Sequence, residues 1–203
     1  MTKPDSSEIP AVVLLAAGGS ARLGQPKQLV QIDGEALVLR TARRLLSLEP
    51  ASLVVVTGCA SAEVSAQLSG LPLQIVHHPG WESGMGSSIA FGVKQVPPEA
   101  KGVLIILCDQ WRVDQTDLER LIKAWNTDIS DIMVASWRDK KAFVFGPPAI
   151  FPRSIIHELK YLTGDQGAKR IIEKYRDRSA FIEMDHAAFD LDEPGDLQQL
   201  NKS

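Results

Sequence analysis

The chain has 203 residues, 44% of them apolar and 23% charged, with a formal net charge of −3. This length and composition are typical of one globular domain that buries a substantial core. The charge excludes a global basic field for nucleic acid, and no apolar run approaches the roughly 20 residues of a membrane helix, so we expect neither a nucleic-acid nor a membrane partner.

The first residues and the cysteines bear on the cellular compartment. Residues 1–10 contain no apolar segment of the kind found in a signal peptide, so we expect a cytoplasmic protein. Cys59 and Cys108 stand singly at the ends of strand-like runs, which is neither the paired spacing of a zinc site nor a disulfide framework. We expect both to be small buried hydrophobic residues.

Over residues 11–130, short apolar runs alternate with helix-period stretches. Strands are predicted over residues 11–17, 53–57, 73–76 and 103–108. Helices are predicted over residues 36–48, 62–68, 88–96 and 117–125. The repeated β-α-β order, and a fourth strand that is apolar on both faces, predict a three-layer α/β/α fold around a Rossmann-like, mostly parallel sheet.

The pattern loosens after residue 131. It predicts strands over residues 132–136 and 142–145, a break at Gly146-Pro147-Pro148, helices over residues 154–162 and 165–175, and a last strand and helix from Ala188. No internal repeat or low-complexity linker separates this half, so we expect it to complete the same sheet and residues 1–203 to form a single domain. Ligands of open parallel sheets bind outside the carboxyl ends of the strands, so sites are expected in the loops there.

The loop after the first predicted strand is rich in glycine and carries two cations, Arg22 and Lys27. Uncovered backbone N–H groups in such a loop can converge on a phosphate. Its glycines at positions 18, 19 and 24 do not make G-x-G-x-x-G, and no early acidic residue follows the second strand, which disfavours a nicotinamide dehydrogenase. Gln25-Pro26 stands where a P-loop has Lys and Ser or Thr. Two interpretations remain: a loop that wraps a triphosphate, or a tight turn with two solvated cations.

Residues 15–27 resemble the signature of the MobA-like nucleotidyltransferases, written loosely as L-A-[AG]-G-x-S-x-R-[ML]-G-x-x-K. Further matches follow in order: WESGMGSS at 81–88, LCDQ at 107–110, GDQGAKR at 164–170 and DLDEPGDL at 190–197. The chain is most similar to the branch that transfers a nucleotide to molybdopterin, and to the molybdenum cofactor cytidylyltransferases in particular. The resemblance implies the nucleotide-diphospho-sugar transferase type of α/β fold and a Mg²⁺-dependent enzyme that moves CMP from CTP to a phosphorylated pterin. It also implies a transient molybdoenzyme partner.

The resemblance implies that nucleotide-binding residues share the glycine-rich loop and the loop after Trp81. These residues are Ala16, Ala17, Gly18, Gly19, Ser20, Arg22, Lys27, Gly86 and Ser88. Within this set Arg22 would bind the β,γ end of the triphosphate and Lys27 would stabilise charge near the α-phosphate. Arg22, Lys27 and Asp109 form the implied catalytic set. Asp109 and Asp192 are the implied metal ligands. The form Ala16-Ala17-Gly18, where guanylyl-transferring relatives have Ala-Gly-Gly, suggests CTP.

The acidic residues also have structural interpretations. Asp109 directly follows the most apolar strand, so its carboxylate should lie at the carboxyl edge of the sheet, where it could be a hard oxygen ligand for Mg²⁺ or a cap for the next turn. Strand alternation would put Asp190 and Asp192 on one face. Asp192 also precedes Glu193-Pro194, a good helix start, so it could be an N-cap. The resemblance implies Asp192, more than Asp190, as the second metal ligand.

The segment around residues 164–170 is implied to face the acceptor, through Gly164, Asp165, Lys169 and Arg170. Taken alone, these residues are more typical of a helix start with solvated cations. Ser87 and Ser88 likewise could cap a helix. On the family pattern, residues 1–130 bind mainly the nucleotide and residues 131–203 mainly the acceptor.

The chain departs from the cytidylyltransferase pattern at three places. Trp111 stands where Pro is usual, His78 where Asn is frequent, and Pro147 where His is usual. All three could border the base or acceptor pocket, so they bear on the acceptor more than on the reaction. The alternatives are a methylerythritol phosphate cytidylyltransferase, a sugar-phosphate nucleotidyltransferase, and a non-catalytic nucleotide-binding partner of a molybdoenzyme.

Overall fold

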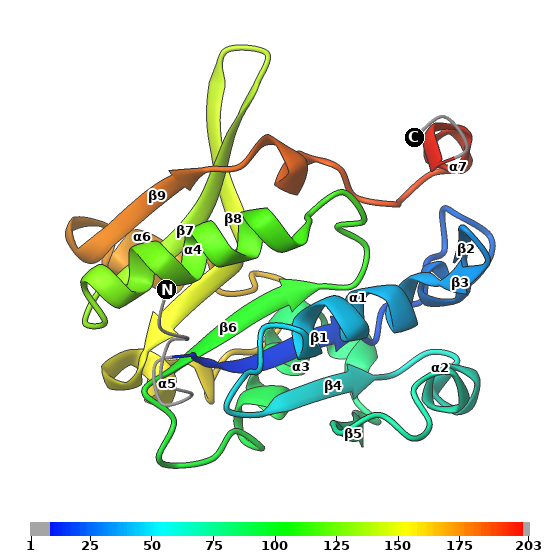
Figure 1. Cartoon of the computed structure of the whole chain (residues 1–203), viewed down its shortest axis with the longest axis horizontal. Coiled ribbons are helices and arrows are strands. Elements are labelled where there is room, and N and C mark those ends of the chain that lie inside the picture. The colour runs from blue at the N-terminus through cyan, green and yellow to red at the C-terminus, as the bar shows by residue number, and fades with distance from the viewer. Residues whose placement is uncertain (1–8, 201–203) are drawn as a thin grey trace.

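A seven-stranded sheet runs through the molecule in the order β5-β4-β1-β6-β8-β7-β9 (Figure 1). The computed structural model describes residues 9–200, so most of the segment on which the signal-peptide expectation rests lies outside it. The strands of this sheet are β1 (Ala11–Ala16), β4 (Leu53–Thr57), β5 (Gln74–His77), β6 (Gly102–Leu107), β7 (Ile132–Asp139), β8 (Ala142–Pro152) and β9 (Ser179–Glu183). β1 pairs in parallel with β4 and β6, whereas β8 is antiparallel to β6 and β7. The predicted mostly parallel α/β sheet is confirmed.

The α-helices cover both faces of this sheet. They are α1 (Leu37–Leu46), α2 (Ser61–Gln67), α3 (Met85–Val93), α4 (Gln115–Thr127), α5 (Arg153–Leu159), α6 (Lys169–Lys174) and α7 (Pro194–Leu200). A small hairpin, β2 (Gln31–Ile32) with β3 (Glu35–Ala36), lies before α1. Within residues 9–200, none of the helices combines the length and apolar character that crossing a membrane requires.

The side-chain alternation of β1 explains the three layers. Val12, Leu14 and Ala16 belong to one buried cluster, which also contains residues of α1 and α4. Ala11, Val13 and Leu15 belong to the opposite cluster, with residues of α3, α5 and α6. Figure 1 shows α1 and α4 in front of the sheet and α3 behind it. Because every residue of β1 is buried, the strand is apolar on both faces, as parallel strands between helix layers are.

A glycine lets α3 lie directly on the sheet. A Cβ atom at Gly92 would lie 2.6 Å from Val13 Cγ1 and 2.6 Å from Val56 Cγ2. These valines belong to β1 and β4, whose carboxyl ends carry loops of the predicted site. The close approach therefore sets the depth of α3 relative to those loops.

β8 corrects one prediction of the sequence. The break expected at Gly146-Pro147-Pro148 is wrong, because β8 runs through it to Pro152. The β7–β8 register shifts there, from Val134 opposite Ala149 to Ala135 opposite Gly146. This β-bulge leaves both prolines outside the ladder. A proline has no N–H to donate to a neighbouring strand, so neither proline interrupts the pairing.

Two further sequence predictions, both in the C-terminal region, differ from the structure. The strand expected from Ala188 is wrong: residues 185–188 form a 3-10 helix, η5 (Asp185–Ala188), and the pairing strand is the earlier β9. The helix predicted over residues 165–175 begins only at Lys169, because Gly164 and Gly167 have φ values of +66° and +52°, outside the helical region. α3 also begins and ends three residues earlier than predicted, at Met85 and Val93.

We expect Gly92→Val to lower the free energy of unfolding by about 2 kcal/mol or more, because overpacking a dense core costs about 1–3 kcal/mol and α3 would have to move off the sheet. Urea denaturation measures the change. Gly195→Ala is the control, since an added Cβ at this exposed glycine of α7 meets no atom within 4 Å. Equal stability of the Gly92→Val protein and the parent would contradict the seating of α3.

Candidate active site

The glycine-rich loop after β1 is held from inside by one buried glutamine. Gln28 Nε2 donates to the carbonyl oxygens of Ala16, at 3.0 Å, and Gly18, at 2.8 Å. The backbone N–H of Lys27 donates to Ser20 Oγ at 3.1 Å, which closes the loop on itself. Gln28 was not among the predicted site residues, because a single amide beside apolar residues is a weak signal. These three hydrogen bonds hold the loop.

Lys27 is the centre of the site. Its Nζ contacts Asp109 Oδ2 and lies 3.1 Å from Asp192 Oδ1. The Lys27 and Asp109 side chains are only 17% and 11% exposed. Burial lowers the pKa of Lys27, but the charges and hydrogen bonds of Asp109 and Asp192 outweigh it, and the net shift of the pKa is upward. Lys27 therefore remains protonated between a carboxylate that follows β6 and one from the C-terminal segment.

Asp192 links Lys27 to Arg22. Arg22 Nη2 lies 2.8 Å from Asp192 Oδ2, and the Arg22 side chain is 67% exposed. The backbone N–H groups of Asp192 and Glu193 donate to Asp196 Oδ2 at 3.0 and 2.8 Å, so Asp196 closes the start of α7. The carboxylate of Asp192 instead faces the two cations that the sequence singles out.

A third carboxylate, Asp190, adds negative charge next to this cluster. Asp190 keeps contact with solvent, yet the protein packed around it and the charges of Asp109 and Asp192 raise its pKa to about 7. Asp109 Oδ1 is buried and has no hydrogen-bond partner within the described residues. The unpartnered Asp109 oxygen and the neighbouring carboxylates are hard oxygen donors of the kind that a divalent cation takes. The donor set therefore fits a divalent metal with oxygen ligands.

A cavity of about 320 Å³ opens beside Lys27. Its lining on one side includes Ala17, Gly18, Lys27 and Asp109, and on the other Trp81, Gly84, Met85 and Ser88. The Trp81 indole lies against the glycine-rich loop, since a Cβ at Gly19 would be 2.9 Å from Trp81 Cη2. A Cβ at Gly58 would be 2.5 Å from Trp81 Cγ. Side chains at either glycine would displace this wall of the cavity.

Two of the motif loops are locked together behind the cavity. The backbone N–H of Gly86 donates to the carbonyl oxygen of Gly164 at 2.7 Å. A Cβ at Gly84 would lie 2.6 Å from the Gly164 carbonyl carbon, and one at Gly86 would lie 2.8 Å from the Thr163 carbonyl oxygen. The segment predicted to face the acceptor is therefore packed directly on the loop predicted to face the nucleotide, and Asp165 lines the cavity as well.

The four residues predicted to face the acceptor do not all meet at one place. Asp165 lines the cavity beside Lys27, and Lys169 lines a smaller, mainly apolar cavity of about 130 Å³. Met85 lines both of these cavities, so they are neighbours. Gly164, Asp165 and Arg170 line a wider hollow of about 600 Å³, which shares Gln166 and Gly167 with the apolar cavity.

The residues that depart from the family pattern have local structural partners. His78 Nε2 lies 3.1 Å from Ser87 Oγ, and its ring stacks on Phe91 with the centroids 4.6 Å apart. Burial, with the nearby charges of His77 and Lys94, lowers the pKa of His78. Pro147 accepts a hydrogen bond from Gln110 at 2.7 Å.

The cysteines partly contradict the sequence prediction. Cys108 is buried as expected and lines the cavity, and burial raises the pKa of its thiol. Cys59 is only partly buried, so the expectation of a buried residue is wrong there. It follows the last strand residue of β4 by two positions, in the loop that leads to α2.

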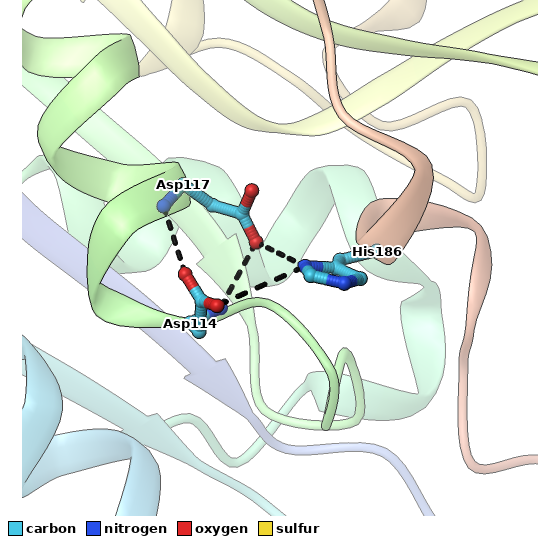
Figure 2. Close-up of side chains that lie close together, drawn as sticks. All are labelled: Asp114, Asp117 and His186. Atoms are coloured by element: carbon cyan, nitrogen blue, oxygen red, sulfur yellow. Dashed lines mark hydrogen bonds and ion pairs between the residues drawn. The ribbon is translucent and has the colours of Figure 1, made fainter.

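A second polar cluster lies away from this cavity (Figure 2). Asp114 and Asp117 form a capping box at the start of α4, and His186 Nδ1 lies 2.7 Å from Asp117 Oδ2. Within residues 9–200 it is the one group in which three potential metal-ligating side chains come together. Its atoms satisfy one another, however, and it shares no lining residue with the cavity beside Lys27. The cluster fastens η5 to α4.

Comparison with known proteins places this site in context. The family model for the MobA-like NTP transferase domain matches residues 12–179. The purine catabolism protein PucB of Bacillus subtilis is 30% identical over 173 residues, which cover 79% of this chain and 79% of that protein. The bifunctional protein GlmU of Streptomyces griseus is 30% identical over 171 residues, which cover 80% of this chain and only 35% of that protein. The chain thus spans about a third of the length of GlmU.

A solved structure shares the whole fold. Rv0371c from Mycobacterium tuberculosis H37Rv superimposes with a TM-score of 0.82 at 28% identity, and the alignment covers 100% of both chains. The structure of Rv0371C in complex with manganese superimposes with a TM-score of 0.77 at 25% identity, covering 95% of this chain and 98% of that one.

We expect Lys27→Met to lower the free energy of unfolding by about 2–3 kcal/mol at neutral pH in EDTA, because it leaves Asp109 shielded from water without its counter-charge. Chemical denaturation measures the change. Lys174→Met is the matched control: it removes a pair with Glu158 at 2.8 Å whose lysine is 58% exposed, and it should change stability much less, because solvent screens an exposed pair. Similar losses in the two proteins would contradict the special position of Lys27.

Proposed function

This chain belongs to the MobA-like NTP transferase family and is a nucleotidyltransferase, and on that basis we propose that it transfers CMP from CTP to molybdopterin or the molybdenum cofactor. The observation that carries the proposal is the cluster of Arg22, Lys27, Asp109 and Asp192 beside a cavity of about 320 Å³. Two cations held by two carboxylates at the end of a parallel sheet suit a triphosphate with its metal.

In the proposed reaction, a phosphate oxygen of the acceptor attacks the α-phosphorus of the NTP. A new P–O bond forms to the acceptor, the bond between the α-phosphorus and the bridging oxygen breaks, and pyrophosphate leaves with that electron pair. The acceptor phosphate is already an anion at neutral pH, so no general base is required. Catalysis then depends on positioning and on neutralising charge.

The proposed roles follow the positions of the charges. The loop from Ala16 to Ser20 would receive the phosphates. The carbonyl oxygens of Ala16 and Gly18 in this loop accept hydrogen bonds from the Gln28 amide. Arg22, with a side chain that is 67% exposed, is free to turn toward the β,γ end of the triphosphate. Lys27 lines the cavity with a side chain that is 17% exposed, and it would stabilise charge near the α-phosphate.

Asp109 and Asp192 are the proposed ligands of Mg²⁺. The buried Asp109 Oδ1, which has no hydrogen-bond partner within the described residues, supports a divalent cation at this position. The manganese complex of the relative Rv0371C supports the same conclusion. When bound, the metal would neutralise charge on the triphosphate and the leaving pyrophosphate.

The choice of CTP rests on the Ala16-Ala17-Gly18 sequence. Ala17 lines the cavity, so its methyl group occupies space that a glycine would leave open to a larger base. Ser88, which is 5% exposed, lines the same cavity, and its hydroxyl is available to a base edge.

The acceptor is proposed to lie on the side of residues 131–203, with residues 1–130 binding mainly the nucleotide. The cavity of about 130 Å³ is lined by Phe145, Phe151 and Met85, and Lys169 Nζ lies 5.3 Å from the centre of the Phe145 ring. Apolar walls with one cation suit a flat ring system that carries a phosphate. We expect the enzyme to work in the cytoplasm and to pass its product to a molybdoenzyme by transient contact.

Pyrophosphate release tests the reaction directly. CTP, GTP, ATP and UTP are each combined with molybdenum-loaded molybdopterin, methylerythritol phosphate and sugar phosphates, with Mg²⁺ and with EDTA. We expect release with CTP and the pterin acceptor, abolished by EDTA and reduced by at least about 100-fold in Asp109→Asn, because this variant removes both a ligand charge and the partner of Lys27.

Other outcomes would redirect the proposal. Release with methylerythritol phosphate or a sugar phosphate, and none with the pterin, would keep the chemistry and change the acceptor. Tight CTP binding by calorimetry with no release from any acceptor would overturn CMP transfer to these acceptors. Full activity in EDTA would remove the metal from the mechanism.

We expect Lys169→Ala to raise the KM for the acceptor by about tenfold or more, the scale of one charge-assisted hydrogen bond, with the affinity for CTP unchanged. Arg170→Ala should have a smaller effect, because Arg170 lines the wider hollow instead of the apolar cavity. Lys141→Ala, at an exposed cation in the turn between β7 and β8, controls for the loss of a positive charge. A larger effect of Arg170→Ala would move the acceptor to the wider hollow.

A further inference from the structure

Gln110 is a buried amide at the junction of three chain segments. It directly follows Asp109 and is 4% exposed. Its Nε2 donates to the carbonyl oxygen of Pro147, at 2.7 Å, and to that of Ala187, at 3.1 Å. The two hydrogens of the side-chain amide are thus both used. The carbonyls belong to β8 and to η5, which are far apart in sequence.

Both carbonyls lack a partner in regular secondary structure. The register shift in β8 leaves Pro147 outside its ladder with β7, and the pairing with β6 ends at Ala149. Ala187 lies in the short helix η5 and is 0% exposed. A buried carbonyl without a donor costs free energy, so the Gln110 amide supplies what the strand and the helix cannot.

The segment held at Ala187 leads directly to the carboxylates of the site. Asp190 and Asp192 follow it by three and five positions, in a stretch that forms no strand. A backbone hydrogen bond also links this segment to the residues after β6: the N–H of Leu191 donates to the carbonyl oxygen of Asp109 at 3.0 Å. Leu191 is 0% exposed, which anchors this link in the core.

The strand held at Pro147 borders the other side of the site. Pro147 and Gly146 line the apolar cavity of about 130 Å³ together with Lys169. One side chain therefore connects the strand end that carries Asp109, the segment that carries Asp192, and the wall of the proposed acceptor cavity.

We propose that Gln110 is a positioning residue that sets the distance between the carboxylate cluster and the acceptor cavity. The inference deepens the proposed function and rests on it. Gln28 provides a direct comparison, because its side-chain amide also donates to two backbone carbonyl oxygens. Those carbonyls belong to the glycine-rich loop. Loss of Gln110 should disturb alignment of the acceptor, whereas loss of Gln28 should disturb binding of the NTP.

Gln110→Met and Gln110→Glu test the proposal, the first by removing the donors at similar size and the second by replacing them with a carboxylate. Hydrogen exchange reports on the segment without any substrate: we expect the Leu191 amide to exchange at least about tenfold faster in both variants. Steady-state kinetics should show kcat lower by about 10–100-fold, the range for residues that orient metal ligands. The Kd for CTP in calorimetry should rise by less than it does in Gln28→Met, because the hydrogen bonds of Gln28 that hold the glycine-rich loop stay in place.

Gln28→Met is the matched control and should show the opposite pattern, with weaker CTP binding and unchanged exchange at Leu191. Unchanged Leu191 exchange in Gln110→Met would overturn the positioning role, as would a loss of CTP affinity equal to that of Gln28→Met. If no acceptor supports pyrophosphate release in the parent protein, the proposed function fails, but the exchange measurement still decides whether Gln110 holds the segment.

Discussion

The ion cluster around Lys27 is the interaction on which the site depends. One ammonium group contacts Asp109 and Asp192, and Arg22 holds Asp192 from the other side. Lys27 and Arg22 belong to the loop after β1, Asp109 follows β6, and Asp192 belongs to the segment before α7. These charges meet because the carboxyl ends of β1 and β6 are adjacent in the sheet. Like charges in a shielded place repel unless opposite charges lie between them, so the arrangement is stable only as a whole.

Backbone shape around the cluster is set by small residues and by buried amides. Gly84 and Gly86 let the segment around Gly164 approach to backbone contact, and Gly19 and Gly58 leave room for the Trp81 indole. These glycines act through close approach, since a Cβ at each would overlap a neighbour. The site is thus built on irregular loops that close packing and backbone hydrogen bonds hold in place.

The sequence predicted the first half of the fold closely, because β1 and β6 are continuous apolar runs. Lys27 and Asp109 lie in the loops that follow these two strands. The sequence predictions failed where contacts with distant parts of the chain determine the local structure. The strand alternation inferred for Asp190 and Asp192 requires a ladder, but their segment is held by single hydrogen bonds to Asp109 and Gln110. The prolines of β8 looked like a break because a bulge cannot be recognised without its partner strand. Buried glutamines were missed for the same reason, since the carbonyls they bind lie far away in sequence or in irregular loops.

The separation of Lys27 and Asp192 by 165 positions also has a consequence during synthesis. At the usual elongation rate of about 5–20 residues per second, a ribosome makes Lys27 on the order of ten seconds before Asp192. By the end of that interval the residues of β1, β4 and β6 have been made, but the complete charge cluster cannot form before Asp192 is added. A nucleotide that needs the whole cluster would therefore bind only to chains whose C-terminal segment has already been made and docked, so its binding reports that translation has passed this point.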